Sequence, residues 1–147
     1  VHTAFTHEGV VLTKGEATTG RLELNLSAQP DLAQTLVVTC AMLGRPFCFS
    51  GLESLRIKET DRLAALQQEL RKLGCEVVVE GDAVLRCDAP QPAAVASAPI
   101  ATYDDHRMAL AFAPCAYRCE GLAIEHPEVV AKSYPSFWDD LKNFEQQ

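Results

Sequence analysis

The stretch that organises this sequence is Leu55-Arg56-Ile57-Lys58-Glu59-Thr60-Asp61-Arg62. Five of its eight residues are charged, and the two signs are interleaved. It follows the apolar run Phe47-Cys48-Phe49 and precedes a segment with the apolar periodicity of an amphipathic helix. The pattern predicts a turn between a strand and a helix, a position where binding and catalytic residues are commonly placed.

If the helix begins near Thr60, Lys58 and Glu59 lie at its mouth and Arg62 lies on its first turn. The free N–H groups and the dipole of a helix start favour anions. A helix that extended back over these residues would place Lys58, Glu59 and Arg62 on one face. A carboxylate held between two cations can transfer protons beside an anion site. The alternative is a solvated helix start with a local ion pair, which is the commoner fate of a charge run.

Composition limits the classes of function. With 147 residues, 48% of them hydrophobic, the sequence predicts one globular domain or part of a larger one. A net charge of −7 and a pI near 5.0 argue against nucleic acid or an anionic membrane as the main partner. The sequence has no apolar run of membrane-spanning length and no secretory signal pattern, so no membrane partner is expected.

The six cysteines form no Cys-x-x-Cys pair, and several lie in apolar segments. They are expected to be reduced core thiols of a cytoplasmic protein. The four histidines are scattered without clustered partners, so no metal site is predicted.

Hydrophobic periodicity predicts a mixed α/β chain. Strands are expected at 9–12, 22–26, 46–50, 75–79, 83–87 and 122–124, and helices at 32–44, 61–73, 108–117 and 136–144. Helix 32–44 is apolar nearly all round, which predicts burial on most sides, whereas helix 61–73 has one leucine face and an opposite face expected in water.

Particular residues are expected to set the ends of these helices. Asp31 is suited to be an N-cap or a first-turn acid. Ser136 and Asp139 have the spacing of a capping-box-like pair. Pro114 is expected to kink its helix or move the boundary.

An internal repeat with an offset of 74 residues is also present. It aligns Asp31 with Asp105 and Lys58 with Lys132, together with several apolar positions. Two copies of one unit are therefore predicted, at about 9–88 and about 100–147. Each copy has an acid at the start of a buried helix, then a strand, then a lysine before an amphipathic helix.

Charged residues gather at the predicted helix starts, which would bring them together if those starts share one end of a layered domain. They are Asp31, Lys58, Glu59, Arg62, Asp105, His106, Arg107 and Lys132. Capping alone is the alternative for the two aspartates at positions 31 and 105. His106 can be oriented by one neighbour and have its pKa moved by both, although a structural histidine is equally open. No Gly-rich phosphate loop, nucleophile elbow or HExxH motif is present.

Four motifs resemble the C-terminal half of the EPSP synthase (3-phosphoshikimate 1-carboxyvinyltransferase) family. They are Arg56–Leu63, Leu70–Gly74, Tyr103–Ala109 and Lys132–Pro135. Their order makes the resemblance specific over about 30–144, while the first 29 residues resemble the family loosely. The resemblance implies transfer of the enolpyruvyl group from phosphoenolpyruvate to the 5-hydroxyl of shikimate 3-phosphate, with release of phosphate, in the shikimate pathway.

The fold class that the resemblance implies is α/β (α+β). Repeated βαβαββ-type units, with buried parallel helices and outer sheets, form an inside-out barrel that residues 1–147 leave incomplete. The chain is then a partial C-terminal domain of a two-domain transferase, and it is expected to be inactive alone. The implied partners are the two small-molecule substrates and the missing N-terminal domain of the same enzyme, with no metal or organic cofactor.

The resemblance also implies residue roles. Asp31 and Glu59 are the expected catalytic acids: Asp31 contacts the acceptor hydroxyls and takes a proton, and Glu59 serves the methylene carbon of the donor. Substrate binding is assigned to Asp31, Lys58, Arg62, Arg107 and Lys132, with Lys58 on the acceptor and the last three on the anionic groups of the donor. Asp105 and His106 are expected to support them.

Two other functions stay open on the sequence. One is the sibling transferase that acts on UDP-N-acetylglucosamine, although the strings Lys58–Arg62 and Asp104–Arg107 favour the shikimate enzyme. The other is a non-enzymatic acidic α/β binding or scaffold module whose basic residues merely pair locally.

Overall fold

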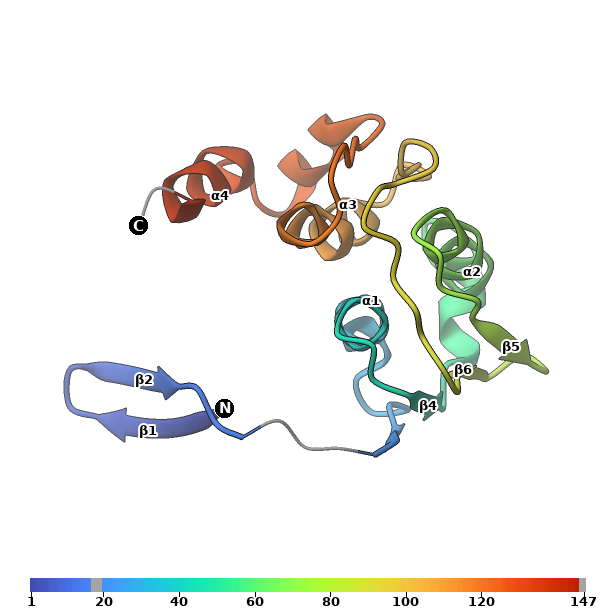
Figure 1. Cartoon of the computed structure of the whole chain (residues 1–147), viewed down its shortest axis with the longest axis horizontal. Helices are drawn as coiled ribbons and strands as arrows, with labels where there is room; N and C mark the ends of the chain where they lie inside the picture. Colours follow the sequence, from blue (N-terminus) through green and yellow to red (C-terminus); the bar gives the residue numbers. More distant parts are fainter. Residues whose placement is uncertain (17–19, 146–147) are drawn as a thin grey trace.

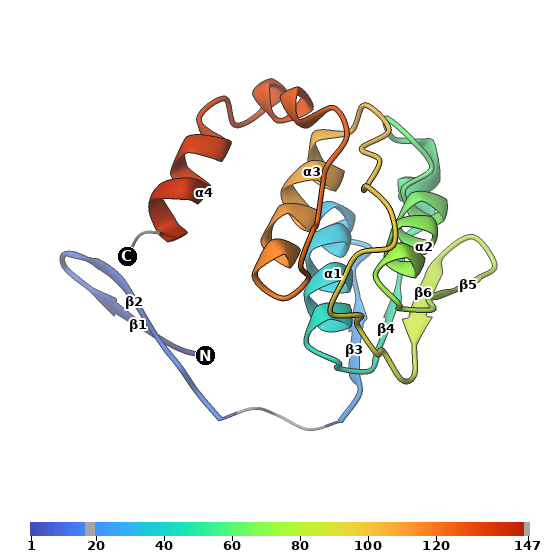
Figure 2. The same cartoon turned by 45° about the horizontal axis from the view of Figure 1, so that its top comes forward.

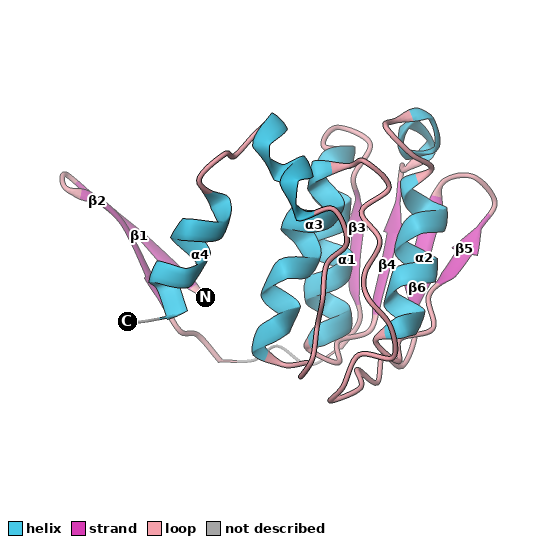
Figure 3. Cartoon of the chain, turned by 90° about the horizontal axis from the view of Figure 1, so that it is seen from above, coloured by secondary structure: helices cyan, strands magenta, loops and turns pink. Residues whose placement is uncertain are grey.

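A four-stranded mixed sheet organises the first half of the chain in the computed structural model, which describes residues 1–16 and 20–145. Its strands follow the order β3-β4-β6-β5, with bounds Leu22–Asn25, Phe47–Ser50, Val84–Cys87 and Val78–Glu80. β3 pairs parallel with β4, whereas β4 with β6 and β6 with β5 are antiparallel. Figure 3 shows this sheet beside the helices.

Alternation along β4 explains how the sheet faces the core. Phe47 and Phe49 are fully buried, while Cys48 and Ser50 between them are half-buried, as the period of two in a strand requires. The predicted hairpin forms around Gly81, whose φ of 56° is readily available to glycine. The strand expected at 75–79 begins only at Val78, so that boundary was wrong.

Two helices cover one face of the sheet: α1 (Ala33–Met42), after the 3-10 turn η1 (Pro30–Leu32), and α2 (Arg62–Lys72), after η2 (Glu53–Ile57) (Figure 1). Most of α1 is buried, as its apolar sequence predicts. The four leucines of α2, Leu63, Leu66, Leu70 and the adjoining Leu73, are fully buried, which confirms its amphipathic pattern.

The start of α2 lies one residue after the predicted Asp61, and Arg62 is on the first turn as expected. The Asp61 side chain accepts a hydrogen bond from the Ala64 N–H at 3.1 Å and acts as N-cap. Lys58 has an extended backbone, so it and Glu59 lie in the turn before the helix. They therefore share no helical face with Arg62.

The second half of the chain packs α3 (His106–Phe112) against α1, as Figure 2 shows. Pro114 lacks an N–H group, and the chain passes at Ala113 into the 3-10 helix η3 (Ala113–Tyr117), which confirms the expected change at this proline. The strand predicted at 122–124 was wrong. Only an isolated bridge joins Ile124 to Ile100 there.

The described chain ends with η4 (Pro127–Lys132) and α4 (Phe137–Glu145). The Ser136 hydroxyl donates to the carboxylate of Asp140 at 2.7 Å, so the capping-box-like pair predicted with Asp139 was wrong. At the other end, β1 (His2–Thr6) and β2 (Gly9–Thr13) form an exposed hairpin that stands apart from the sheet in Figure 1.

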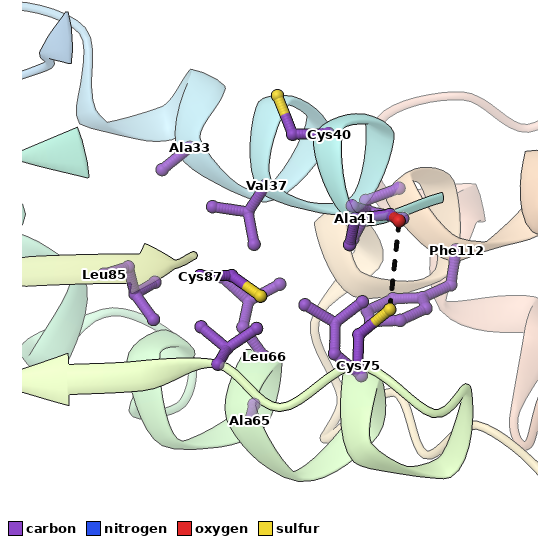
Figure 4. Close-up of a cluster of buried hydrophobic side chains, with 14 of the residues drawn as sticks. Ala33, Val37, Cys40, Ala41, Ala65, Leu66, Cys75, Leu85, Cys87 and Phe112 are labelled. Atoms are coloured by element: carbon purple, nitrogen blue, oxygen red, sulfur yellow. Dashed lines mark hydrogen bonds between the residues drawn. The ribbon is translucent and has the colours of Figure 1, made fainter. Parts of the chain in front are cut away.

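The core lies between the sheet and the helices. Figure 4 shows Val37 of α1, Leu66 of α2, Leu85 of β6 and Phe112 of α3 among the buried side chains of this core. All six cysteines, each within the described residues, are free thiols, and five of them are buried. Burial raises the pKa of the Cys75 thiol to about 11. Among the described helices, none combines the length and apolar character needed to cross a membrane.

Candidate active site

Arg62, the first residue of α2, lies at the centre of a charged network. Its side chain is 1% exposed. It donates hydrogen bonds to Asp105 at 2.6 and 3.2 Å, to Asp31 at 2.9 Å and to Glu59 at 2.7 Å. One guanidinium thus joins carboxylates from the starts of α1, α2 and α3, and the predicted convergence of helix starts is confirmed for these residues.

The Arg62–Asp105 pair is the buried end of the network. Asp105 is fully buried and faces the guanidinium with both oxygens, a forked geometry that gives strong charge-assisted bonds. Asp105 is also the N-cap of α3, because its Oδ1 accepts from the Arg107 N–H at 2.9 Å. Asp105 therefore caps α3, as the alternative interpretation expected, and also takes part in the charged network. Its supporting role in the site stays a prediction.

Asp31 lies at the half-exposed edge of the same network. It belongs to the first turn of η1 and makes no cap bond; instead its carboxylate meets three cations. The Asp31 oxygens lie 2.9 Å from Arg62, 3.3 Å from Arg107 and 3.5 Å from Lys58. Burial by itself would raise the pKa of Asp31, but Arg107, Lys58 and Arg62 together outweigh it and hold the pKa below its usual range.

Glu59 and Lys58 flank Asp31 from the turn before α2. The Glu59 side chain is 41% exposed, so its bond to Arg62 orients a carboxylate that solvent or a ligand can still reach. Arg107 is similarly half-exposed and also donates to the backbone carbonyl of Asp31 at 3.4 Å. The exposed edge therefore combines two accessible carboxylates with two accessible cations.

The turn before α3 has an unusual backbone. Tyr103 and Asp104 are consecutive non-glycine residues with φ of 54° and 55°, a left-handed conformation that L-residues rarely adopt. The carbonyl of Asp104 accepts a hydrogen bond from the exposed Lys132 amine at 2.9 Å. Lys132 thus contacts the backbone next to Asp105, and its predicted role in substrate binding stays a prediction.

His106 is the remaining predicted residue. It is half-buried, and its Nδ1 is enclosed without a hydrogen-bond partner among the described residues. Its supporting role stays a prediction. So does direct contact between Arg62 and the donor, since three carboxylates already surround that guanidinium.

Glu69 is the charged residue that sequence reasoning missed. It lies on or beside the face of α2 that was predicted to be exposed to water, yet it is fully buried. Its oxygens accept from the Tyr103 hydroxyl at 2.7 Å, the Ala101 N–H at 2.9 Å and the Lys72 amine at 2.6 Å. The available signal was its spacing of seven residues from Arg62, which places both on one side of the helix. Within the described residues, no group of three or more His, Cys, Asp or Glu side chains is arranged to hold a metal ion.

Comparison with known proteins identifies the family. Residues 5–141 match the family model described as EPSP synthase (3-phosphoshikimate 1-carboxyvinyltransferase). The chain belongs to the EPSP synthase family. This confirms the family resemblance that the four motifs carry.

Individual relatives agree with that assignment. The 3-phosphoshikimate 1-carboxyvinyltransferase of Bacteroides fragilis is 47% identical over 142 residues, which cover 97% of this chain and 35% of the relative. That of Cellvibrio japonicus is 39% identical over 140 residues, covering 89% and 32%. The chain therefore spans about a third of the length of these curated EPSP synthases.

A solved structure supports the fold. EPSP synthase from Acinetobacter baumannii superposes with a TM-score of 0.65 at 24% identity, over 78% of this chain and 27% of that one. The mixed α/β fold class expected from sequence is thereby confirmed, and the chain forms no closed barrel over its described residues, in keeping with an incomplete EPSP synthase domain.

The network predicts a large difference between two arginines on the same helix. Replacing Arg62 by Ala leaves the buried Asp105 carboxylate without its partner, a change that typically costs about 3–5 kcal/mol of unfolding free energy. Arg71→Ala is the matched control: its pair with Glu76 is exposed on both sides and should contribute less than about 1 kcal/mol. Urea unfolding of both variants measures the difference, and equal losses would contradict the central role of Arg62.

The lowered pKa of Asp31 predicts acid sensitivity. A carboxylate with a folded-state pKa below the unfolded value of about 3.9 stabilises the fold above that pH, and this contribution is lost as pH falls through the folded pKa. The midpoint temperature of thermal unfolding should therefore decrease as the pH is lowered below about 4. In Asp31→Asn this temperature should be lower than that of the wild type at pH 7, and it should decrease less steeply in acid. A decrease in acid as steep as that of the wild type would exclude Asp31 as a source of the acid sensitivity.

Proposed function

We propose that this chain is the C-terminal part of an enzyme that transfers the enolpyruvyl group from phosphoenolpyruvate to the 5-hydroxyl of shikimate 3-phosphate and releases phosphate. The observation that carries the proposal is the sharing of Arg62 by Asp31 and Glu59, two accessible carboxylates beside Arg107 and Lys58. Family membership gives the reaction class, because both relatives described above are named for this activity.

The two carboxylates are suited to different proton transfers. The low pKa of Asp31 keeps it ionised near neutral pH, so it can accept a hydrogen bond and then the proton from the attacking hydroxyl. Glu59 in its acid form would donate a proton to the methylene carbon of phosphoenolpyruvate. The acceptor oxygen then bonds to the neighbouring carbon, which still holds the phosphate, and a tetrahedral intermediate results.

Elimination reverses the proton transfer at carbon. The bond to the phosphate oxygen breaks, phosphate leaves, and the methyl group returns a proton to Glu59, which restores the double bond. The proton taken by Asp31 passes to phosphate or solvent. The sequence forms one carbon–oxygen bond to the acceptor, breaks one to phosphate and moves protons, with no net oxidation or reduction, so positioned acids, bases and charges suffice.

The cations at the exposed edge suit the anionic donor. Arg107 offers a fork that can bind a carboxylate or phosphate with two parallel hydrogen bonds, whereas Lys132 adds a point charge. Lys58 lies beside Asp31, where we place the acceptor. Arg62 holds both catalytic carboxylates in place from behind, and we propose that it reaches the donor when ligands rearrange these contacts.

We further propose that residues 1–147 form a partial C-terminal domain with repeat units at about 9–88 and about 100–147. The strand and helix order β3-α1-β4-α2-β5-β6 supports the first unit. The second has an acid before α3 and Lys132 before α4. An apolar groove of about 240 Å³ lies between α1 and η3, and we propose that the rest of the same enzyme covers it.

The reduced thiols of this chain suit a cytoplasmic enzyme.

Glu59→Gln in the full-length protein tests the chemistry. Loss of a general acid typically lowers kcat by about 10²–10⁴-fold, while an amide of the same shape preserves the contacts that hold the site. Product formation and phosphate release should fall together. Glu53→Gln, at an exposed position of the 3-10 helix η2, is the control and should keep full activity. Wild-type protein that forms product from UDP-N-acetylglucosamine instead would refute the assigned acceptor.

The purified 147-residue chain should not turn over. It holds about a third of the relatives' length, and its cations face solvent, where charge attraction is weak. A sensitive phosphate-release assay, with full-length protein as positive control, measures this. Sustained enolpyruvyl transfer by the chain alone would show that the site needs no second domain.

A further inference from the structure

The segment before α3 is fastened along α2 by a ladder of contacts. The Lys72 carbonyl accepts from the Ser97 N–H at 3.1 Å, and the Lys72 amine donates to the Pro99 carbonyl at 2.8 Å. One turn nearer the start of α2, Glu69 accepts from Ala101 and Tyr103. Two turns further, Arg62 binds Asp105. The segment therefore runs antiparallel to α2, as the yellow-to-orange chain in Figure 2 shows.

Glu69 and Arg62 fix this segment on either side of its strained part. The two left-handed residues, Tyr103 and Asp104, lie between the Ala101 amide held by Glu69 and the Asp105 carboxylate held by Arg62. Such a conformation costs on the order of 1–3 kcal/mol per residue and persists only where surrounding contacts impose it. The Tyr103 hydroxyl bonds to Glu69 at 2.7 Å and lies 2.9 Å from the Gln68 amide oxygen, so the side chain of a strained residue is itself an anchor.

The strained turn sets the position of groups that the proposed reaction needs. It directs the Asp104 carbonyl to Lys132 at 2.9 Å and places Asp105 where it caps α3 through the Arg107 N–H. A turn that relaxed to an ordinary backbone would move both contacts. The orientation of Arg107 and Lys132 thus depends on a bond made seven residues along α2 from Arg62.

We propose that Glu69 and Tyr103 are positioning residues of this enzyme: their partly buried hydrogen bond holds the 101–105 turn in the left-handed conformation that presents Arg107 and Lys132 to the anionic donor. The part that concerns the donor rests on the proposed function. Burial, and then the Glu69 carboxylate, raise the pKa of the Tyr103 hydroxyl above its usual range, so it stays a hydrogen-bond donor throughout the physiological pH range.

Tyr103→Phe in the full-length protein removes the hydroxyl and keeps the ring. A hydrogen bond to a charged group shifts an equilibrium by about tenfold or more, so we expect the KM for phosphoenolpyruvate to rise about tenfold with a smaller change in kcat. Amide hydrogen exchange of a peptide covering 101–108 should become faster. Glu69→Gln should act in the same direction, and the double variant should be no worse than the more affected single variant, because the two groups act as one unit.

Gln67→Ala is the matched control. It removes one partly buried hydrogen bond on the same helix, from the Gln67 amide to the Val77 carbonyl at 2.8 Å, away from the turn. It should change neither the KM for phosphoenolpyruvate nor exchange at 101–108. If Tyr103→Phe matches this control in both measurements, the proposal is overturned. If both variants raise KM equally while exchange at 101–108 stays at the wild-type rate, general destabilisation of α2 is the cause and the proposal also fails.

The exchange measurement needs no substrate, which separates the two proposals. Wild-type protein that transfers no enolpyruvyl group refutes the proposed function. The comparison of 101–108 exchange between Tyr103→Phe and Gln67→Ala then decides by itself whether the Glu69–Tyr103 bond holds the turn.

Discussion

A buried guanidinium needs acceptors, and this requirement shapes the end of the molecule where the site lies. Arg62 is almost fully enclosed, and an unpaired charge in such a place is very costly. Its acceptors come from the starts of three helices, on Asp31, Glu59 and Asp105. The helices α1, α2 and α3 therefore have to begin at one point, and the rest of the fold follows from packing their bodies against each other and the sheet.

The distances between charged groups in this network increase from its buried end to its exposed edge. Bonds of Arg62 to its carboxylates have shortest distances of 2.6–2.9 Å, whereas Arg107 and Lys58 lie 3.3 and 3.5 Å from Asp31. The inner pairs hold the geometry, and the outer cations are free to exchange partners at little cost. An anion that drew Arg107 away would remove part of the charge that lowers the pKa of Asp31, so ligand binding and the basicity of that carboxylate are linked.

Local pattern predicted the elements whose causes are local. The leucines of α2, the alternation at Phe47 and Phe49 and the break at Pro114 all depend on residues within one or two turns. The strand expected at 122–124 failed because a strand needs a partner, and the chain offers only one bridge through Ile100 there. The start of α2 was predicted to within one residue, because its cap is also local: Asp61 accepts from the N–H of Ala64, three residues along the chain.

The candidate site divides in the same way. Charged residues at helix starts could be named from sequence, and the resemblance gave them roles, because both depend on motifs. Such motifs could not reveal Glu69, since two of its three donors come from residues 101 and 103, more than thirty positions along the chain. Read alone, a glutamate beside Leu70 on α2 is a surface residue; its burial becomes favourable only after the turn before α3 supplies the donors that compensate it.

In this arrangement, the positions of the charged groups and the strength of their attraction to a ligand have different causes. The described chain holds Asp31 and Glu59 against the buried Arg62, so these two carboxylates are already in position before a ligand arrives. Their exposed side chains still face water, where two unit charges 4 Å apart attract with only about 1 kcal/mol, against several times more where water is excluded. In the proposed enzyme, then, covering this edge with the remaining domain strengthens the interactions with substrate without adding a single charge to the part described.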